Sequence, residues 1–251
     1  MIEFTTLIII FCTFLLAGTV KGVIGLGLPT VSLAIMAVLF DLPTAMALLI
    51  VPSLITNIWQ AAIGGHGQNL MNRLWPFLSV AALTVWIGAI GLTQLNLGLL
   101  SALLGMLLVA YAIIGLTGFR VSIGRSREAW AGPVAGAING ILTGLTGSFV
   151  VPGVMYLQAI GLPRDQLVQA MGMLFTVSTL ALAIALRRND LLTLQLGLVS
   201  LAALLPAIIG MIIGQKLRQI LSEQQFRRIF FISLLVLGIY IILQSSALTV
   251  G

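Results

Sequence analysis

Charged side chains are scarce in this sequence. Only 7% of its 251 residues are Asp, Glu, Lys or Arg, whereas 60% are hydrophobic. A soluble domain of this length has too small a core to bury so much apolar surface, so the composition predicts an integral membrane protein. The apolar stretches are as long as spanning helices and lack the period-two alternation of barrel strands, which favours an all-α bundle.

Residues that carry chemistry are also rare. The sequence has one His and one Cys, and it contains neither an H-E-x-x-H nor a G-x-S-x-G motif. A disulfide framework, a thiolate metal site and most membrane enzymes are therefore excluded, and we expect no enzymatic activity and no cofactor. The six carboxylates all fall at the ends of apolar segments or in loops: Glu3, Asp41, Glu128, Asp165, Asp190 and Glu223.

The positive charge does not indicate a nucleic-acid partner. Although the net charge is +6, the basic residues sit in short loops rather than along one face with interleaved aromatic residues. Nucleic-acid-binding domains instead gather Lys and Arg on one face. Membrane orientation explains the basic excess better.

One stretch interrupts the apolar sequence early in the chain. Residues 17–30 read Ala-Gly-Thr-Val-Lys-Gly-Val-Ile-Gly-Leu-Gly-Leu-Pro-Thr, with four glycines, a proline and Lys21. Lys21 is the only basic residue that does not lie near a predicted membrane edge. Because a charge inside the bilayer is unfavourable, Lys21 is expected to have a partner or a function.

Gly, Pro and polar clusters divide the chain into about ten apolar segments, which predict eight to ten helices in a single transmembrane domain, residues 1–251. In the first half we expect segments at 1–17, 31–40, 44–63, 74–92 and 97–119. In the second half we expect 129–138, continued by a glycine stretch at 139–148, then 149–160, 166–186, 191–214 and 226–243. The polar loop 120–128 separates the halves.

The second half repeats features of the first. Gly18-x-x-x-Gly22 matches Gly136-x-x-x-Gly140, which aligns Lys21 with Asn139. Further matched pairs are Pro43 with Pro163, Thr56 with Thr176, and residues 83–88 with 205–210. Short segments interrupted by Gly and Pro at matching positions indicate a transporter built from two repeats, residues 1–119 and 129–251, with Gly-rich discontinuous helices near the midplane.

The loop charges predict how the repeats are oriented. If each glycine-broken pair enters and leaves on one side, nine basic residues share a face: Arg73, Arg120, Arg125, Arg127, Arg164, Lys216, Arg218, Arg227 and Arg228. Only Arg187 and Arg188 then lie opposite. The positive-inside rule makes the first face, with linker 120–128, cytoplasmic and both termini non-cytoplasmic. The two repeats are then inverted relative to each other.

The glycine motifs resemble those of a known family. The motif Gly22-x-x-Gly25-x-Gly27-x-Pro29 and its degenerate copy Gly140-x-x-x-Gly144-x-x-Gly147, followed by Pro152, resemble the sulfite exporter TauE/SafE family of permeases over essentially the whole chain. This resemblance implies a multi-pass permease of the cell (inner or plasma) membrane for sulfite or an organosulfonate. It leaves uptake or export open.

We expect the anion site where the two breaks meet, because amides at helix starts attract anions and Lys21 supplies a countercharge. From the first break the predicted substrate-binding residues are Lys21, Gly22, Gly25 and Gly27. From the second they are Asn139, Gly140, Thr143, Gly144, Thr146, Gly147 and Ser148. From the long helices they are Thr56, Asn57, Trp59, Gln60, Thr176 and Ser178.

Several alternatives fit the same residues. The Gly-x-x-x-Gly spacing also suits close helix packing. A passive anion channel, or a permease for another small organic anion, is compatible with the sequence. The predicted partners are a small anion and the bilayer, and coupling to protons or to sodium and assembly as a monomer or a homodimer are equally compatible.

Overall fold

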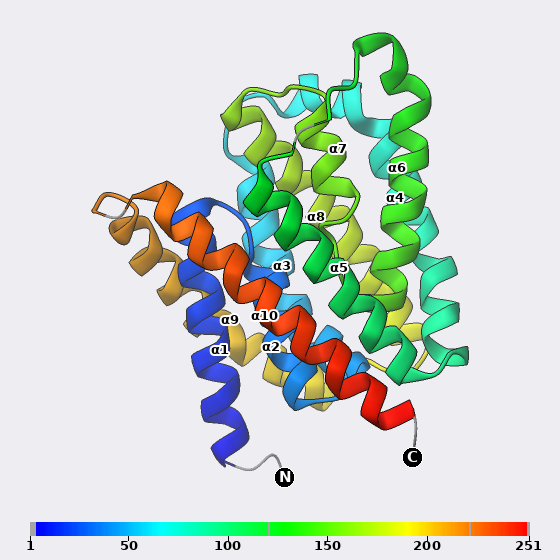
Figure 1. Cartoon of the computed structure of the whole chain (residues 1–251), viewed down its shortest axis with the longest axis vertical. Coiled ribbons are helices and arrows are strands. Elements are labelled where there is room, and N and C mark those ends of the chain that lie inside the picture. The colour runs from blue at the N-terminus through cyan, green and yellow to red at the C-terminus, as the bar shows by residue number, and fades with distance from the viewer. Residues whose placement is uncertain (1–3, 120, 221, 250–251) are drawn as a thin grey trace.

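The described parts of the chain are almost entirely α-helical (Figure 1). The computed structural model describes residues 4–119, 121–220 and 222–249, and no strand occurs within these ranges. The predicted positions of Glu3, Arg120 and both chain termini lie outside the described residues.

The helices follow the predicted order. The first half contains α1 (Phe4–Ile24), α2 (Leu28–Leu39), α3 (Leu42–Ala62), α4 (Gly67–Gln94) and α5 (Leu97–Thr117). A short 3-10 helix (Arg125–Arg127) precedes α6 (Glu128–Thr146), α7 (Gly153–Ala159), α8 (Arg164–Arg188), α9 (Leu194–Leu217) and α10 (Glu223–Thr249). In the described chain, seven helices are long and apolar enough to span a membrane, namely α1, α3, α4, α5, α8, α9 and α10. The all-α membrane class is thus confirmed.

The ends predicted for the glycine-rich segments were wrong. The first helix does not end at residue 17 but continues to Ile24, so only residues 25–27 interrupt the chain. Likewise α6 runs through most of the second glycine stretch to Thr146, and only 153–159 of the segment expected at 149–160 is helical. Glycine is tolerated inside a membrane helix when it faces another helix closely, and that is the case here.

Two helix pairs are in contact through these glycines. A Cβ added at Gly18 of α1 would lie 2.1 Å from the carbonyl oxygen of Ala207 in α9, and one added at Gly140 of α6 would lie 2.2 Å from that of Ala81 in α4. The contacts are reciprocal, because Gly210 of α9 faces α1 and Gly88 of α4 faces α6 in the same way. The close-packing interpretation of the Gly-x-x-x-Gly spacing is therefore confirmed.

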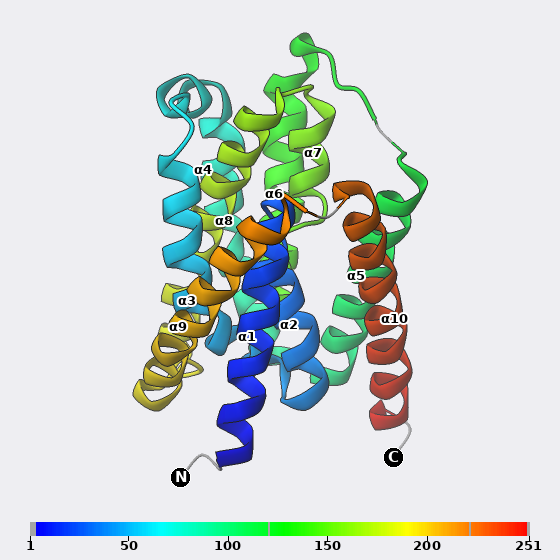
Figure 2. The ribbon, with the colours of Figure 1, turned by 90° about the vertical axis from the view of Figure 1, so that its left-hand side faces the viewer.

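The two interrupted helix pairs point in opposite directions (Figure 2). Helix α1 begins at the end of the molecule where α10 ends, and α2 returns toward that end. Helices α6 and α7 leave from and return toward the opposite end. The long helices α3 and α8 pack against each other, and α5 packs against α10.

One ion pair ties three elements together at the end where α6 begins. The guanidinium of Arg73 in α4 donates to both carboxylate oxygens of Glu128, at 2.8 and 2.6 Å. It also donates to the carbonyl oxygen of Ile160 at 3.2 Å, just after α7. Two parallel bonds from a guanidinium form the strongest kind of ion pair, and they hold the α6–α7 unit against α4.

We expect a methyl group at residue 140 to separate α4 from α6. Gly140→Ala should lower the free energy of unfolding by on the order of 1–3 kcal/mol, because its new Cβ meets backbone that cannot rotate away. The control is Gly197→Ala in α9, where a Cβ meets nothing within 4 Å. Thermal unfolding in detergent measures both variants, and equal melting temperatures would contradict the close contact.

A second prediction concerns pH. The hydrogen bond from Arg73 lowers the pKa of the Glu128 carboxyl, which lies at the start of α6. A lowered folded-state pKa stabilises the protein above the unfolded pKa, about 4.3, and this contribution disappears as the pH falls further through the folded value. Glu128→Gln should lower the melting temperature at pH 7 by about 2–4 °C and weaken its acid dependence. If the melting temperatures of wild type and variant fell by the same amount from pH 7 to pH 3, this role of Glu128 would be refuted.

Candidate functional site

Lys21 occupies the last turn of α1, just before the break, and its side chain is buried at 4% exposure. The ammonium donates to the hydroxyl of Thr56 at 3.1 Å and to the side-chain oxygen of Asn57, both on α3. Both acceptors are neutral, and the only ion pair between described residues is that of Arg73 with Glu128. The positive charge of Lys21 is thus buried without a carboxylate.

The same part of α3 holds unused hydrogen-bonding groups. The Asn57 side-chain nitrogen and the Ser53 hydroxyl are buried and find no partner among the described residues. A buried donor without an acceptor is unfavourable by about 1–3 kcal/mol. The polar cluster around Lys21 therefore has spare donor capacity as well as spare charge.

Pro52 changes the hydrogen bonding of α3 one turn before these polar groups. A proline inside a helix has no N–H to donate to the carbonyl four residues earlier. That carbonyl, of Leu48, accepts instead from the Ser200 hydroxyl of α9 at 2.8 Å, and the Val51 amide donates to the same hydroxyl at 3.0 Å. One turn later, Thr56 donates to the Pro52 carbonyl at 2.7 Å, which directs its oxygen as an acceptor for Lys21.

Lys21 lines a cavity of about 290 Å³ between four helices. The lining residues are Lys21, Gly22 and Gly25 from α1 and the adjoining break; Thr56, Trp59, Gln60 and Ile63 at the end of α3; Val168 of α8; and Met211, Gln215 and Arg218 at the end of α9. These are the ends of α1, α3 and α9 and the start of α8, so the cavity lies on the side of the bundle that carries the basic loops.

Six of the predicted site residues line this cavity, and Asn57 joins them through Lys21. Sequence reasoning missed Ile63, Val168, Met211, Gln215 and Arg218. The spacing of Met211, Gln215 and Arg218 by four and three residues places them on one helical face, which was a usable signal. Gly27 does not line the cavity; its backbone is left-handed, with φ 107°, and it packs beside Val20 and Phe230.

The residues predicted from the second break form a separate group. The Asn139 side-chain oxygen accepts from the Gly153 amide at 3.0 Å, where α7 begins. Thr143 donates to the Ser148 carbonyl at 2.9 Å, and Thr146 accepts from the Ser148 amide at 3.2 Å. These side chains shape the α6–α7 turn, yet the Asn139 side-chain nitrogen and the Ser148 hydroxyl remain buried without a partner among the described residues.

The other second-half predictions occupy packed positions. Gly140 and Gly144 of α6 face the backbone of α4, and Gly147 faces the side chains of Leu33 and Met46. Thr176 of α8 donates to the Gly172 carbonyl at 2.7 Å. Ser178 is buried and has no partner in the described chain. None of these residues lines the Lys21 cavity.

Helices α3 and α8 cross closely beside the cavity. A Cβ at Gly172 would lie 2.6 Å from the Ala61 nitrogen, so the two backbones are in contact. Two amides link them further: Gln60 donates to the Val168 carbonyl and Gln169 to the Ala61 carbonyl, each at 2.8 Å. Because the helices run antiparallel, Thr176 lies one turn beyond Gly172, at the level of Asn57.

A family model for the sulfite exporter TauE/SafE matches residues 10–241. The chain belongs to the sulfite exporter TauE/SafE family. Its members are membrane transporters of sulfite or related anions, not enzymes, and this match confirms the resemblance based on the glycine motifs. Searches of curated proteins and of solved structures gave no match.

We expect water-soluble reagents to reach the cavity from the basic face only. Cys12 is the single native thiol and is exposed, so the test uses a Cys12→Ser background carrying Gln215→Cys. A membrane-impermeant maleimide should label this cysteine in inside-out vesicles and not in intact cells. Asn96→Cys, in the α4–α5 link, is the control and should show the reverse pattern. Labelling of Gln215→Cys from the outer side would contradict the placement of the opening.

Proposed function

We propose that this TauE/SafE-family permease carries a small sulfur oxyanion, an organosulfonate or sulfite, by alternating access, and that the Lys21 cavity is its anion site. The observation that supports this best is a buried ammonium whose acceptors are neutral. A lone charge in a membrane protein is kept when it serves a solute or an ion. A bound anion would supply the missing negative charge.

The donors around Lys21 suit a sulfonate or sulfite group. An ammonium has three N–H donors, and two of them are used by Thr56 and Asn57. The third N–H and the free Asn57 amide nitrogen can donate to two oxygens of one oxyanion. Arg218 and Gln215 at the end of α9 add a second cation and an amide to the same cavity. Gly25 leaves room for the anion beside the backbone, because a Cβ there would meet only the Val168 side chain at 3.8 Å, whereas Gly22 is packed against α9.

We further propose that residues 1–119 and 129–251 are inverted repeats joined by the linker 120–128. The helix contacts support this because exchanging the halves reproduces the most extensive of them. Helix α1 packs on α9 as α6 packs on α4, and α3 packs on α9 as α8 packs on α4. The pairs α3–α8 and α5–α10 join corresponding helices. The opposite directions of α1–α2 and α6–α7 are those that inversion requires.

The repeat gives the second break a role. In this proposal both breaks lie near the bilayer midplane, and the cavity by Lys21 belongs to the state that is open toward the basic, cytoplasmic face of the cell membrane. The unused groups of Asn139, Ser148 and Ser178 then bind the anion in the state that is open to the other side. The backbone of that half is stabilised by hydrogen bonds that the hydroxyls of Thr143, Thr146 and Thr176 donate to backbone carbonyls.

We expect Lys21→Gln to reduce anion transport about tenfold to a hundredfold, the effect of removing a charged hydrogen-bond donor from a buried anion. Purified protein in liposomes is tested for counterflow of sulfite, thiosulfate, sulfoacetate, taurine and toluenesulfonate. The same panel is used in thermal-shift assays, where a bound substrate raises the wild-type melting temperature by mass action.

Lys216→Gln makes the same chemical change at an exposed position of α9 and serves as the control. It should transport like wild type. Wild-type flux and ligand shift in Lys21→Gln would remove Lys21 from the site. Flux without counterflow would identify a channel instead of a carrier.

A further inference from the structure

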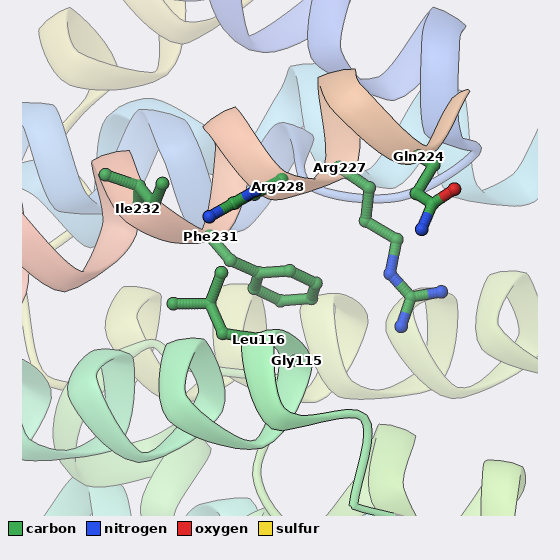
Figure 3. A pocket seen from close by; sticks show the side chains of 7 residues that line it. All are labelled: Gly115, Leu116, Gln224, Arg227, Arg228, Phe231 and Ile232. Atoms are coloured by element: carbon green, nitrogen blue, oxygen red, sulfur yellow. The ribbon is translucent and has the colours of Figure 1, made fainter. Parts of the chain in front are cut away.

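A second cavity, larger than that of Lys21, lies on the other side of the bundle. Its volume is about 790 Å³, and it lies between the last turn of α5 and the first turns of α10 (Figure 3). The lining residues are Gly115, Leu116, Gln224, Arg227, Arg228, Phe231 and Ile232. It shares no lining residue with the Lys21 cavity, so the proposed transport site does not account for it.

Its apolar side is built by a close fit around Phe231. A Cβ at Gly115 would lie 2.2 Å from the tip of the Phe231 ring, so only glycine lets this ring pack against α5. Tyr111 holds the ring edge-on, with centroids 5.2 Å apart. Leu116 and Ile232 flank it and remain 38% and 44% exposed. Phe231 itself is buried at 4% exposure, so Leu116 and Ile232 supply the apolar surface that is open to the surroundings.

The other side of the cavity is cationic. The Arg227 guanidinium lies 5.6 Å from the centroid of the Phe231 ring and extends from α10 toward α5, whereas Arg228 extends along α10 (Figure 3). Gln224 adds an amide one turn earlier. The described side chains include no carboxylate in the lining and no ion pair to either arginine. Two guanidiniums without acidic partners are complementary to a phosphate group.

The polar and apolar sides are arranged as in an amphiphile. The arginines lie in the first turns of α10, at the basic end of the bundle, and Leu116, Phe231 and Ile232 lie beside them. An inorganic anion needs only the cationic part. A phospholipid uses both parts, and basic pockets between membrane helices on the cytoplasmic side recognise anionic headgroups.

We propose that this cavity binds an anionic phospholipid. Its phosphate is bound by Arg227 and Arg228, Gln224 donates to the headgroup, and the first methylenes of its acyl chains pack on Leu116 and Ile232 beside the buried Phe231 ring. This site is independent of which anion occupies the Lys21 cavity.

Native mass spectrometry and thermal-shift assays of the detergent-purified full chain test the site, without any transport substrate. The probes are phosphatidylglycerol and phosphatidylcholine with the same acyl chains, and glycerol phosphate and inorganic phosphate as soluble headgroup equivalents. We expect phosphatidylglycerol to bind and stabilise the protein, and the other three to have no comparable effect. Equal effects of the two lipids, or equal binding of a soluble phosphate, would overturn the proposal.

Arg227→Gln combined with Arg228→Gln should weaken phosphatidylglycerol binding about tenfold or more. The matched control combines Arg125→Gln with Arg127→Gln, which removes the same charge from exposed positions on the same face. If the double variant does not fold, Arg228→Gln alone keeps the contact of Arg227 with Phe231 and must still weaken binding. An equal loss in the control, or unchanged binding in the cavity variants, would show that these arginines form no lipid site.

Discussion

The structure depends on backbone-to-backbone packing of helices through glycine. In a bilayer, apolar side chains gain little by moving from lipid to a protein neighbour, so helices associate through close contact and buried polar bonds. Helix α1 lies against α9 through Gly18 and Gly22, and α6 lies against α4 through Gly136, Gly140 and Gly144. These contacts place each interrupted helix beside a continuous one. The position of each break is thus fixed by the continuous helix beside it and not by the sequence of the break itself.

The packing of α1 on α9 places Lys21 within hydrogen-bonding distance of α3. Since α1 is fixed on α9, the last turn of α1 delivers the ammonium to Thr56 and Asn57. Pro52 of α3 leaves the Leu48 carbonyl without its usual helical donor. The Ser200 hydroxyl of α9 donates to that carbonyl and so links α3 to α9 as well. Three helices therefore meet around one buried charge, and every bond to that charge comes from a neutral group.

The arginines at the basic end of the bundle have different roles. Arg73 is neutralised by Glu128 and ties α4, α6 and the end of α7 together. Arg218 lines the Lys21 cavity, and Arg227 and Arg228 line the cavity between α5 and α10. The same excess of positive charge that predicts orientation is thus distributed among an ion pair and two cavities. The arginines differ in role because their neighbours differ in charge and polarity.

The pattern of apolar segments, with their polar and Gly or Pro boundaries, was enough to predict an all-helical membrane protein and the order of its long helices. The glycine motifs were enough to indicate the family, and Lys21 stood out as the one cation far from a membrane edge. These features are local or compositional, so each can be recognised without knowing what any helix touches.

Helix continuity through Gly18, Gly22 and Gly140 was decided only by tertiary structure. A glycine ends a helix or lets it pack closely depending on whether another backbone lies opposite. Tertiary structure also decided which residues line the Lys21 cavity. Gln215 and Arg218 are distant from Lys21 in sequence, and they line the cavity because α9 packs on α1. The sequence by itself determined that a charge is buried in a membrane bundle. Which helices surround that charge was settled by the three-dimensional packing, because contacts between distant segments depend on geometry that no local pattern encodes.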